Sequence, residues 1–236
     1  MTGESGALDR SSVINALIAT YGNITTAVEG LREAQLIRPS RCAGWTVGDV
    51  LYHVLLDARR ALRTFVTPTS AEPDVDHVSY WRPFSPRSGK PFALGGAAAA
   101  AHARHVRIAA SAYPPGALFW EWRETSAAAC RAAQGCPYER VAAQGHVLGI
   151  ADFVATLVVE AAVHLLDLNV GLPNAPAPDP VALELVRRVL DGLLETPVPV
   201  SWDDATYALK GTGRVGLTEE ECFVLGHLAG QFPMFG

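Results

Sequence analysis

The sequence predicts a mostly helical protein with a short C-terminal extension that mixes helix and strand. Three observations predict this class. Several long segments repeat apolar residues at intervals of three and four positions, the spacing of one face of an α-helix. Thr46 and Thr218 stand where two such segments begin, as N-cap residues do. Only two short runs, at 140–143 and 206–210, have the pattern of a strand.

Two helices are expected in the N-terminal part. Residues 11–31 form the first, because their apolar side chains follow the helical spacing. A loop runs through Pro39 to Trp45. The run Thr46-Val-Gly-Asp49 then fits a capping box, in which the Thr hydroxyl and the Asp carboxylate bond free backbone N–H groups. The helix that it opens is expected to reach about Val66.

The segment from Pro68 to Gly96 is expected to be a long loop. It is rich in Pro, Ser and Gly, contains Tyr80, Trp81 and Phe84, and shows no periodicity. Long loops in compact domains often act as lids or as the walls of a pocket. We therefore expect this loop to border a site.

The rest of the chain divides at residue 173. Before it we expect helices at 97–112, 115–134 and 150–170, a strand around 140–143, and a helix stop at Gly171-Leu-Pro173. Residues 174–180 form a Pro-rich linker. After it come a helix at 181–195, a strand at 206–210 and a last helix opened by Thr218. Residues 1–173 and 174–236 are the two expected units, a metal-binding helical bundle and a small C-terminal segment.

Composition and charge exclude several classes of protein. The net charge is −5 and the Lys and Arg residues are scattered, so no basic stripe is present for nucleic acid. The apolar stretch 147–172 carries Asp152, Glu160, His164 and Asp167, too many ionisable groups for a membrane span. No signal peptide is visible, and the four cysteines form no C-x-x-C pair. A cytoplasmic protein with free thiols is expected.

The apolar helix expected at 150–170 carries a polar stripe that needs partners. Thr156, Glu160, His164 and Asp167 share one face, and apolar side chains cover the rest of the surface. A buried carboxylate without a partner is costly, and a bound cation is one way to offset that cost. Glu160 and His164 are spaced i, i+4 and can meet at one ion. A Glu–His hydrogen bond or an Arg partner would satisfy the same stripe.

The other histidines give weaker signals. His53 lies opposite the apolar arc of its helix, so it is a surface residue unless that polar stripe lines a pocket. His102 and His105 stand among arginines on a helix and are expected to be solvated. His77 and His146 lie in loops without partners at ligand spacing.

Two blocks of sequence resemble a known family. The run Arg41-Cys-Ala-Gly-Trp-Thr-Val-Gly-Asp-Val-Leu-Tyr-His53 resembles the second-helix signature of the mycothiol-dependent maleylpyruvate isomerase family, in the DinB-like superfamily. The run Val159-Glu-Ala-Ala-Val-His-Leu-Leu-Asp-Leu168 is similar to the second block of that family. The C-terminal run from Gly211 to Phe235 also resembles tails of the family, and Leu157 stands where members often have Arg.

The resemblance implies a DinB-like four-helix bundle with a short C-terminal α/β extension. Carried over by position, the metal ligands would be His53, Glu160 and His164, and the metal would be a divalent ion, usually zinc. Arg214 is the best match to an arginine that acts on the substrate carboxylate. Spacing alone leaves two roles open for Asp57 and Asp167, which each lie one helical turn from one of these histidines: an acceptor that orients the ring, or a solvated acid on the surface.

The function implied is that of a metal-dependent enzyme that uses mycothiol as a thiol cosubstrate. Such an enzyme would isomerise an electrophilic small molecule or transfer sulfur to it, acting as a monomer or homodimer. Two alternatives remain at this stage. The metal could activate water for hydrolysis, or the bundle could be a non-catalytic module that binds a metal or a small ligand.

Overall fold

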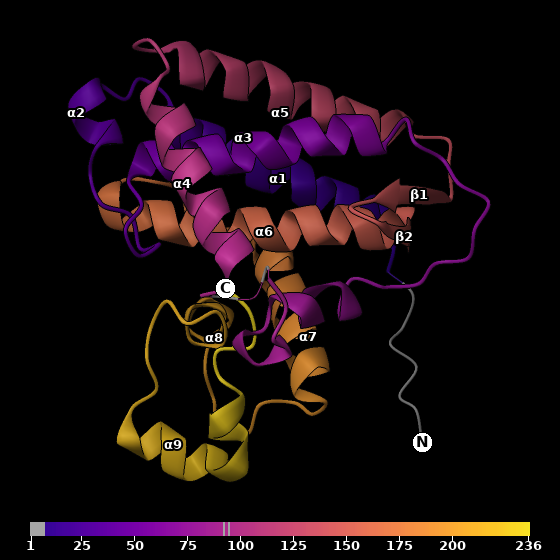
Figure 1. Ribbon diagram of the computed structural model, residues 1–236, viewed down its shortest axis with the longest axis vertical. Helices are drawn as coiled ribbons and strands as arrows, with labels where there is room; N and C mark the ends of the chain where they lie inside the picture. Colours follow the sequence, from indigo (N-terminus) through magenta and orange to yellow (C-terminus); the bar gives the residue numbers. More distant parts are fainter. Residues whose placement is uncertain (1–7, 92, 94) are drawn as a thin grey trace.

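The computed structural model describes residues 8–91, 93 and 95–236 and confirms the mostly helical class (Figure 1). The described elements, in chain order, are α1 (Arg10–Val28), α2 (Glu33–Leu36), α3 (Val47–Thr64), the 3-10 turns η1 (Ser79–Phe84) and η2 (Pro86–Ser88), α4 (Ala97–Ser111), α5 (Ala117–Gly135), β1 (Arg140–Ala143), β2 (His146–Gly149), α6 (Ile150–Gly171), α7 (Pro180–Leu194), α8 (Asp204–Gly211), α9 (Glu219–Leu225) and the 3-10 turn η3 (Gly226–Gln231).

Four long helices form a bundle. Helix α1 packs against α5 and α6, and helix α3 packs against the same two helices, so the four close into a ring (Figure 1). Helix α4 lies against α3 and crosses the bundle on one side. The expectation of a bundle of four main helices is confirmed.

Helix α6 is the core of the bundle. It is long and apolar enough to cross a membrane, but 83% of its most apolar window is buried inside the protein. Helices α1, α3, α7 and α8 and the two strands pack against it, so its many apolar residues are stabilised by packing. This is the pattern of a central helix in a folded domain.

The start of α3 is fixed by the expected capping box. The Thr46 hydroxyl accepts a hydrogen bond from the Asp49 backbone N–H at 3.2 Å, and the Asp49 carboxylate accepts one from the Thr46 N–H at 2.8 Å. Two backbone donors at the helix end are thereby satisfied. The cap sets the register of α3 and hence the direction in which each of its polar side chains points.

The C-terminal end of α6 lies close to the segment that leads into α3. The backbone N–H of Arg41 donates to the Asp167 carbonyl at 2.9 Å. At Gly171 an added Cβ would lie 2.7 Å from Val47 Cγ2 and 2.9 Å from the Pro39 carbonyl oxygen. Only a residue without a side chain fits there, so Gly171 lets α6 and the start of α3 come together.

The structure contains a β-hairpin, of which the sequence predicted one of the two strands. Strand β1 has the predicted bounds, but it pairs antiparallel with β2, which the sequence analysis missed. Gln144 and Gly145 join the strands, and both have positive φ, as in the two-residue turns that match strand twist. The expected loop at 68–96 runs past this hairpin, where Asp74 N–H donates to the Val147 carbonyl at 3.1 Å. Its described residues contain only 3-10 turns.

The C-terminal extension is helical, and the strand predicted at Thr206–Lys210 was wrong. These residues lie within α8, whose N-cap Asp203 accepts a hydrogen bond from the Thr206 N–H at 2.6 Å. Tyr207, Lys210 and Gly211 are buried on one face at helical spacing, which the short alternating run had hidden. Helix α7 packs against α1 and α6, while α8 packs against α6 and α7. A unit boundary at residue 173 stays a prediction.

Replacing Gly171 by Ala tests the close approach of α6 to the start of α3. We expect Gly171→Ala to lower the free energy of unfolding by roughly 1–3 kcal/mol, because the methyl group overpacks against backbone and Val47. Gly22→Ala is the matched control: it lies in α1 with nothing within 4 Å of the added Cβ. It should instead stabilise by about 0.5–1 kcal/mol, since Ala favours helix. Thermal or denaturant unfolding measures both, and equal effects would contradict the packing described.

Candidate metal centre

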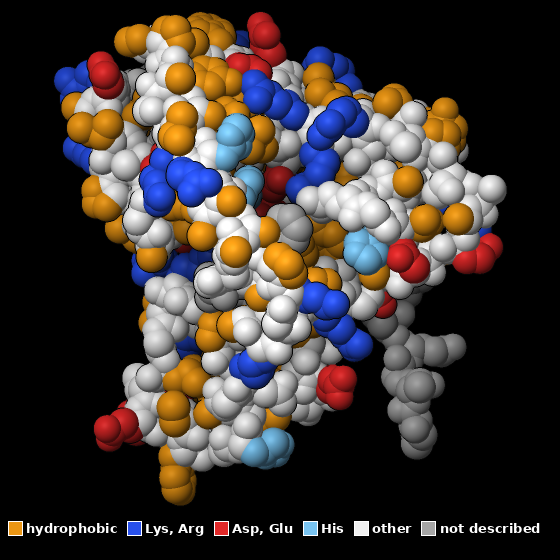
Figure 2. Space-filling view, in the orientation of Figure 1, with side chains coloured by type: hydrophobic (Ala, Val, Ile, Leu, Met, Phe, Trp, Pro, Cys, Tyr) orange, Lys and Arg blue, Asp and Glu red, His pale blue; other side chains and the backbone are white. Residues whose placement is uncertain are grey.

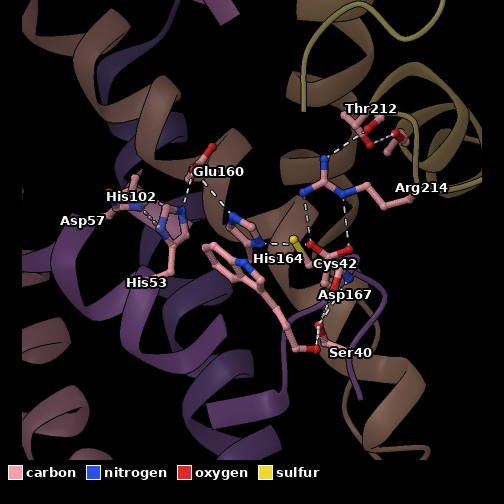
Figure 3. Close-up of polar contacts among 12 residues, drawn as sticks. Ser40, Cys42, His53, Asp57, His102, Glu160, His164, Asp167, Thr212 and Arg214 are labelled. Carbon is pink, nitrogen blue, oxygen red and sulfur yellow. Dashed lines mark hydrogen bonds and ion pairs between the residues drawn. The ribbon is translucent and has the colours of Figure 1, made fainter. Parts of the chain in front are cut away.

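Three side chains from two helices meet on one side of the bundle (Figure 3). His53 is on α3, and Glu160 and His164 are on α6. The Oε1 atom of Glu160 lies 2.9 Å from His53 Nε2 and 3.5 Å from His164 Nε2. One potential ligand atom from each of the three lies within 4.8 Å of the others. The structure therefore brings together the three residues that the sequence singled out.

The packing of α3 against α6 creates this convergence. The i, i+4 spacing on α6 stacks Glu160 and His164 on the same face, turned toward α3. His53 projects from the polar side of α3, but that side faces α6 and α4, and only 13% of its side chain is exposed. Its surface placement from periodicity was wrong because the polar stripe faces other parts of the protein rather than bulk water.

The cluster concentrates charge in a partly buried place. Burial alone would raise the pKa of Glu160, but the contacts with His164 and His53 hold it well below its ordinary value. Burial alone would lower the pKa of His164, but hydrogen bonding to Asp167 and the charge of Glu160 raise it to about 9. The carboxylate is thus ionised and attracts positive charge. A proton on His164 or a metal ion can supply that charge.

A chain of contacts on the far side of His164 fixes its ring. His164 Nδ1 lies 2.9 Å from Asp167 Oδ2, and Asp167 is completely buried. Arg214 donates to both carboxylate oxygens of Asp167, from Nε at 3.2 Å and from Nη2 at 3.1 Å. Because Asp167 accepts a hydrogen bond from Nδ1 of His164, the other ring nitrogen, Nε2, faces Glu160 (Figure 3). The expectation that Asp167 contacts a ligand histidine agrees with this geometry.

Arg214 belongs to this buried series of side-chain contacts and does not line an open pocket. Its Nη1 also donates to the Thr212 carbonyl at 3.1 Å, and only 9% of its side chain is exposed. The carboxylate that it meets in this structure is Asp167 of the same chain. Its predicted action on a substrate carboxylate stays a prediction.

His102 is the contact that the sequence analysis missed. It was expected to be solvated, but it is half-buried, and its Nε2 lies 3.0 Å from Nδ1 of His53. Burial and the neighbouring His53 lower the pKa of His102, so a neutral ring is available to accept the Nδ1 proton. No spacing rule links residues 53 and 102, since only the crossing of α4 over α3 brings them together.

The loop before α3 forms a wall of the cluster. The Trp45 ring stacks on His164 at an angle of 6° with centroids 6.4 Å apart, and meets His53 edge-on at 5.2 Å. Cys42 in the same loop is partly buried, and burial followed by the charge of Asp167 raises its pKa to about 11. Its thiol is therefore neutral near pH 7. Trp45 shields the two imidazoles from solvent.

Among the described residues, the remaining candidates form no hydrogen bond with His53, Glu160 or His164. Asp57 Oδ2 is 4.0 Å from Nε2 of His53, so it does not take the Nδ1 position expected of an orienting acid. His77 and His146 do have partners: His77 Nδ1 lies 2.7 Å from Asp152, and His146 Nδ1 lies 2.9 Å from Asp74. These two pairs tie the 68–96 loop to α6 and to β2.

Comparison with known families gives a match over a large part of the chain. The family model described as the mycothiol maleylpyruvate isomerase N-terminal domain matches residues 20–169, well over half of the chain. The matched range contains α3, α4 and all but the last two residues of α6, and with them His53, His102, Glu160 and His164, whereas Arg214 lies outside it. No curated protein and no solved structure shows significant similarity to the chain. On the extent of the family match, the chain belongs to the mycothiol maleylpyruvate isomerase N-terminal domain family.

Proposed function

We propose that the chain is a metal-dependent enzyme that uses a low-molecular-weight thiol, mycothiol, to act on an electrophilic small molecule. The reaction is isomerisation of that molecule or transfer of sulfur to it. The observation that carries the proposal is the convergence of His53, Glu160 and His164 within 4.8 Å of one another. The family match supports the link to mycothiol and to a small-molecule substrate.

The donor set fits a divalent ion, with zinc the first choice. Two imidazole nitrogens and one carboxylate oxygen are ligands that zinc takes readily, and the Nδ1 atoms of both histidines have polar partners behind them. Three protein ligands leave a fourth position open, as in catalytic zinc sites. A bound divalent ion supplies positive charge that lowers the pKa of a thiol beside it.

The chain's own residues prepare the place where the thiol reacts. Asp167 and His102 hold the two imidazoles with Nε2 directed inward, and Arg214 holds Asp167. Trp45 and α4 limit the access of water to the same point. In the proposed isomerisation the thiolate adds to one carbon of the double bond, and the electron pair of that bond moves onto the conjugated carbonyl of the substrate. The bond is then single and rotates. The electron pair returns, expels the same thiolate and restores the double bond in the other geometry.

Elemental analysis of the purified protein tests the metal. We expect about one zinc per chain in the wild type and a large loss in His164→Ala, because two ligands hold zinc far less well than three. His227→Ala is the matched control, since His227 is exposed on η3 in the C-terminal extension. Equal zinc content in the wild type and in His164→Ala would contradict the proposed ligand set.

Replacing His102 tests whether its contact with Nδ1 orients the His53 ring. His102→Ala removes the partner of Nδ1, so we expect zinc affinity to fall roughly 10–100-fold, the range for lost outer-shell partners. His105→Ala provides the comparison, because His105 is exposed on the same helix. Competition with a chromogenic chelator measures both affinities. An unchanged affinity in His102→Ala would show that the 3.0 Å contact does not orient the ligand.

Thiol dependence separates the proposed reaction from hydrolysis. With maleylpyruvate as the trial substrate, turnover by zinc-loaded protein should require mycothiol and should fall to background in Glu160→Gln, which removes the anionic ligand. Product formation at the same rate without any thiol would favour zinc-activated water. Unchanged metal content and unchanged thiol-dependent turnover in Glu160→Gln would defeat the proposal.

A further inference from the structure

The polar side of α3 continues beyond His53 to an ion pair between Asp57 and Arg60. Asp57 lies one turn further along, with its Oδ2 atom 4.0 Å from His53 Nε2. Its other oxygen, Oδ1, lies 2.9 Å from Nη2 of Arg60. A single carboxylate therefore connects the candidate metal centre to an arginine on the same helix.

Arg60 differs from the other arginines near the bundle in how few partners it has. Among the described residues, its polar contact within hydrogen-bond reach is the one from Nη2 to Asp57. About a quarter of its side chain is exposed. Arg59, the next residue, bonds Tyr113 and Glu121, and Arg214 bonds Asp167 and Thr212. A guanidinium has five N–H donors, so most of those on Arg60 remain open.

The atoms around Arg60 are also short of partners. Asp57 Oδ2 and the Tyr21 hydroxyl are buried and have no hydrogen-bond partner among the residues that the structure describes. The charges of Asp57, Tyr80 and Glu160 raise the pKa of Arg60 against the opposing effect of burial, so these groups lie within electrostatic range of it. Buried polar atoms without partners are rare in folded proteins and call for a ligand or water.

A recess opens on the surface beside α4, the helix that packs against α3. Figure 2 shows a recess beside α4, with acidic atoms at depth between histidine side chains and Lys or Arg side chains. A guanidinium beside acidic groups suits a ligand that presents one carboxylate to it. A phosphate group would place up to two charges beside Asp57 and Glu160, whereas a carboxylate group places one there and matches the planar guanidinium.

We propose that Arg60, held by Asp57, is a carboxylate-binding residue that takes the anionic end of the electrophilic substrate beside the His53–Glu160–His164 cluster. The inference rests on the proposed function for the identity of that substrate. The Tyr21 hydroxyl and Asp57 Oδ2 would then bond polar groups of the same molecule. Binding at Arg60 would fix the substrate in one orientation relative to the cluster.

Calorimetric titration with maleate tests this site directly on the full chain, both zinc-loaded and stripped of metal. We expect Arg60→Gln to weaken maleate binding roughly tenfold or more in both forms, the usual effect of losing a charge-assisted hydrogen bond. Arg59→Gln is the matched control and should bind maleate as the wild type does. The neutral diamide of maleic acid should not bind measurably to any of these proteins.

A second variant controls for a folding defect. Zinc binding by the Arg60 variants separates the proposed role of Arg60 from the proposed metal-dependent function. Arg60→Lys keeps the charge beside Asp57 but removes the planar fork, so its maleate affinity should fall between those of the wild type and Arg60→Gln. Zinc binding should be unchanged in both variants. Wild-type maleate affinity in Arg60→Gln and Arg60→Lys, or no binding by the wild type, would overturn the role of Arg60. Neither result bears on the metal ligands, which the zinc content of His164→Ala tests.

Discussion

The packing of α3 against α6 is the constraint on which the rest of the site depends. His53 and Glu160 are 107 positions apart in the chain, yet His53 Nε2 and Glu160 Oε1 are 2.9 Å apart. The capping box of Thr46 sets where α3 begins, and Gly171 allows the C-terminal end of α6 to approach that beginning. A one-residue shift in either helix would turn a ligand by about 100°. The site is therefore a product of helix register as well as of residue identity.

Helical periodicity and capping signals predicted most of the fold. The bounds of α3, α4, α6 and α7 agree with expectation to within a few residues. Helices α3 and α7 have capped starts and apolar faces, α6 is a long apolar segment, and α4 opens with a run of five alanines. The failures lie in short elements. The strand expected at 206–210 is part of α8, and β2 was not expected, since a run of four or five residues fits both periods. Packing against α6 and α7 decides the structure of α8.

The candidate site was predictable in part, for a physical reason. The i, i+4 pair on α6 is local, so the sequence places Glu160 and His164 together. His53 was assigned by resemblance alone, because periodicity shows that a stripe is polar without showing what it faces. The contact of His102 with His53 depends on the crossing of α4 over α3, so no spacing could have found it. Asp57 and Arg60 are spaced i, i+3 on α3, so their pairing is local, but the sequence does not show what surrounds the pair. Arg214 reaches the site from the C-terminal extension and links that segment to His164 through Asp167.

The most direct test of the account is the position of zinc in a crystal of the zinc-loaded protein, located by anomalous scattering. The account predicts one peak with His53 Nε2, His164 Nε2 and an oxygen of Glu160 about 2.0–2.2 Å away, and at least one further position open to a small molecule. A peak at another place, or an ion bound by the α6 pair with the His53 ring turned away, would contradict it.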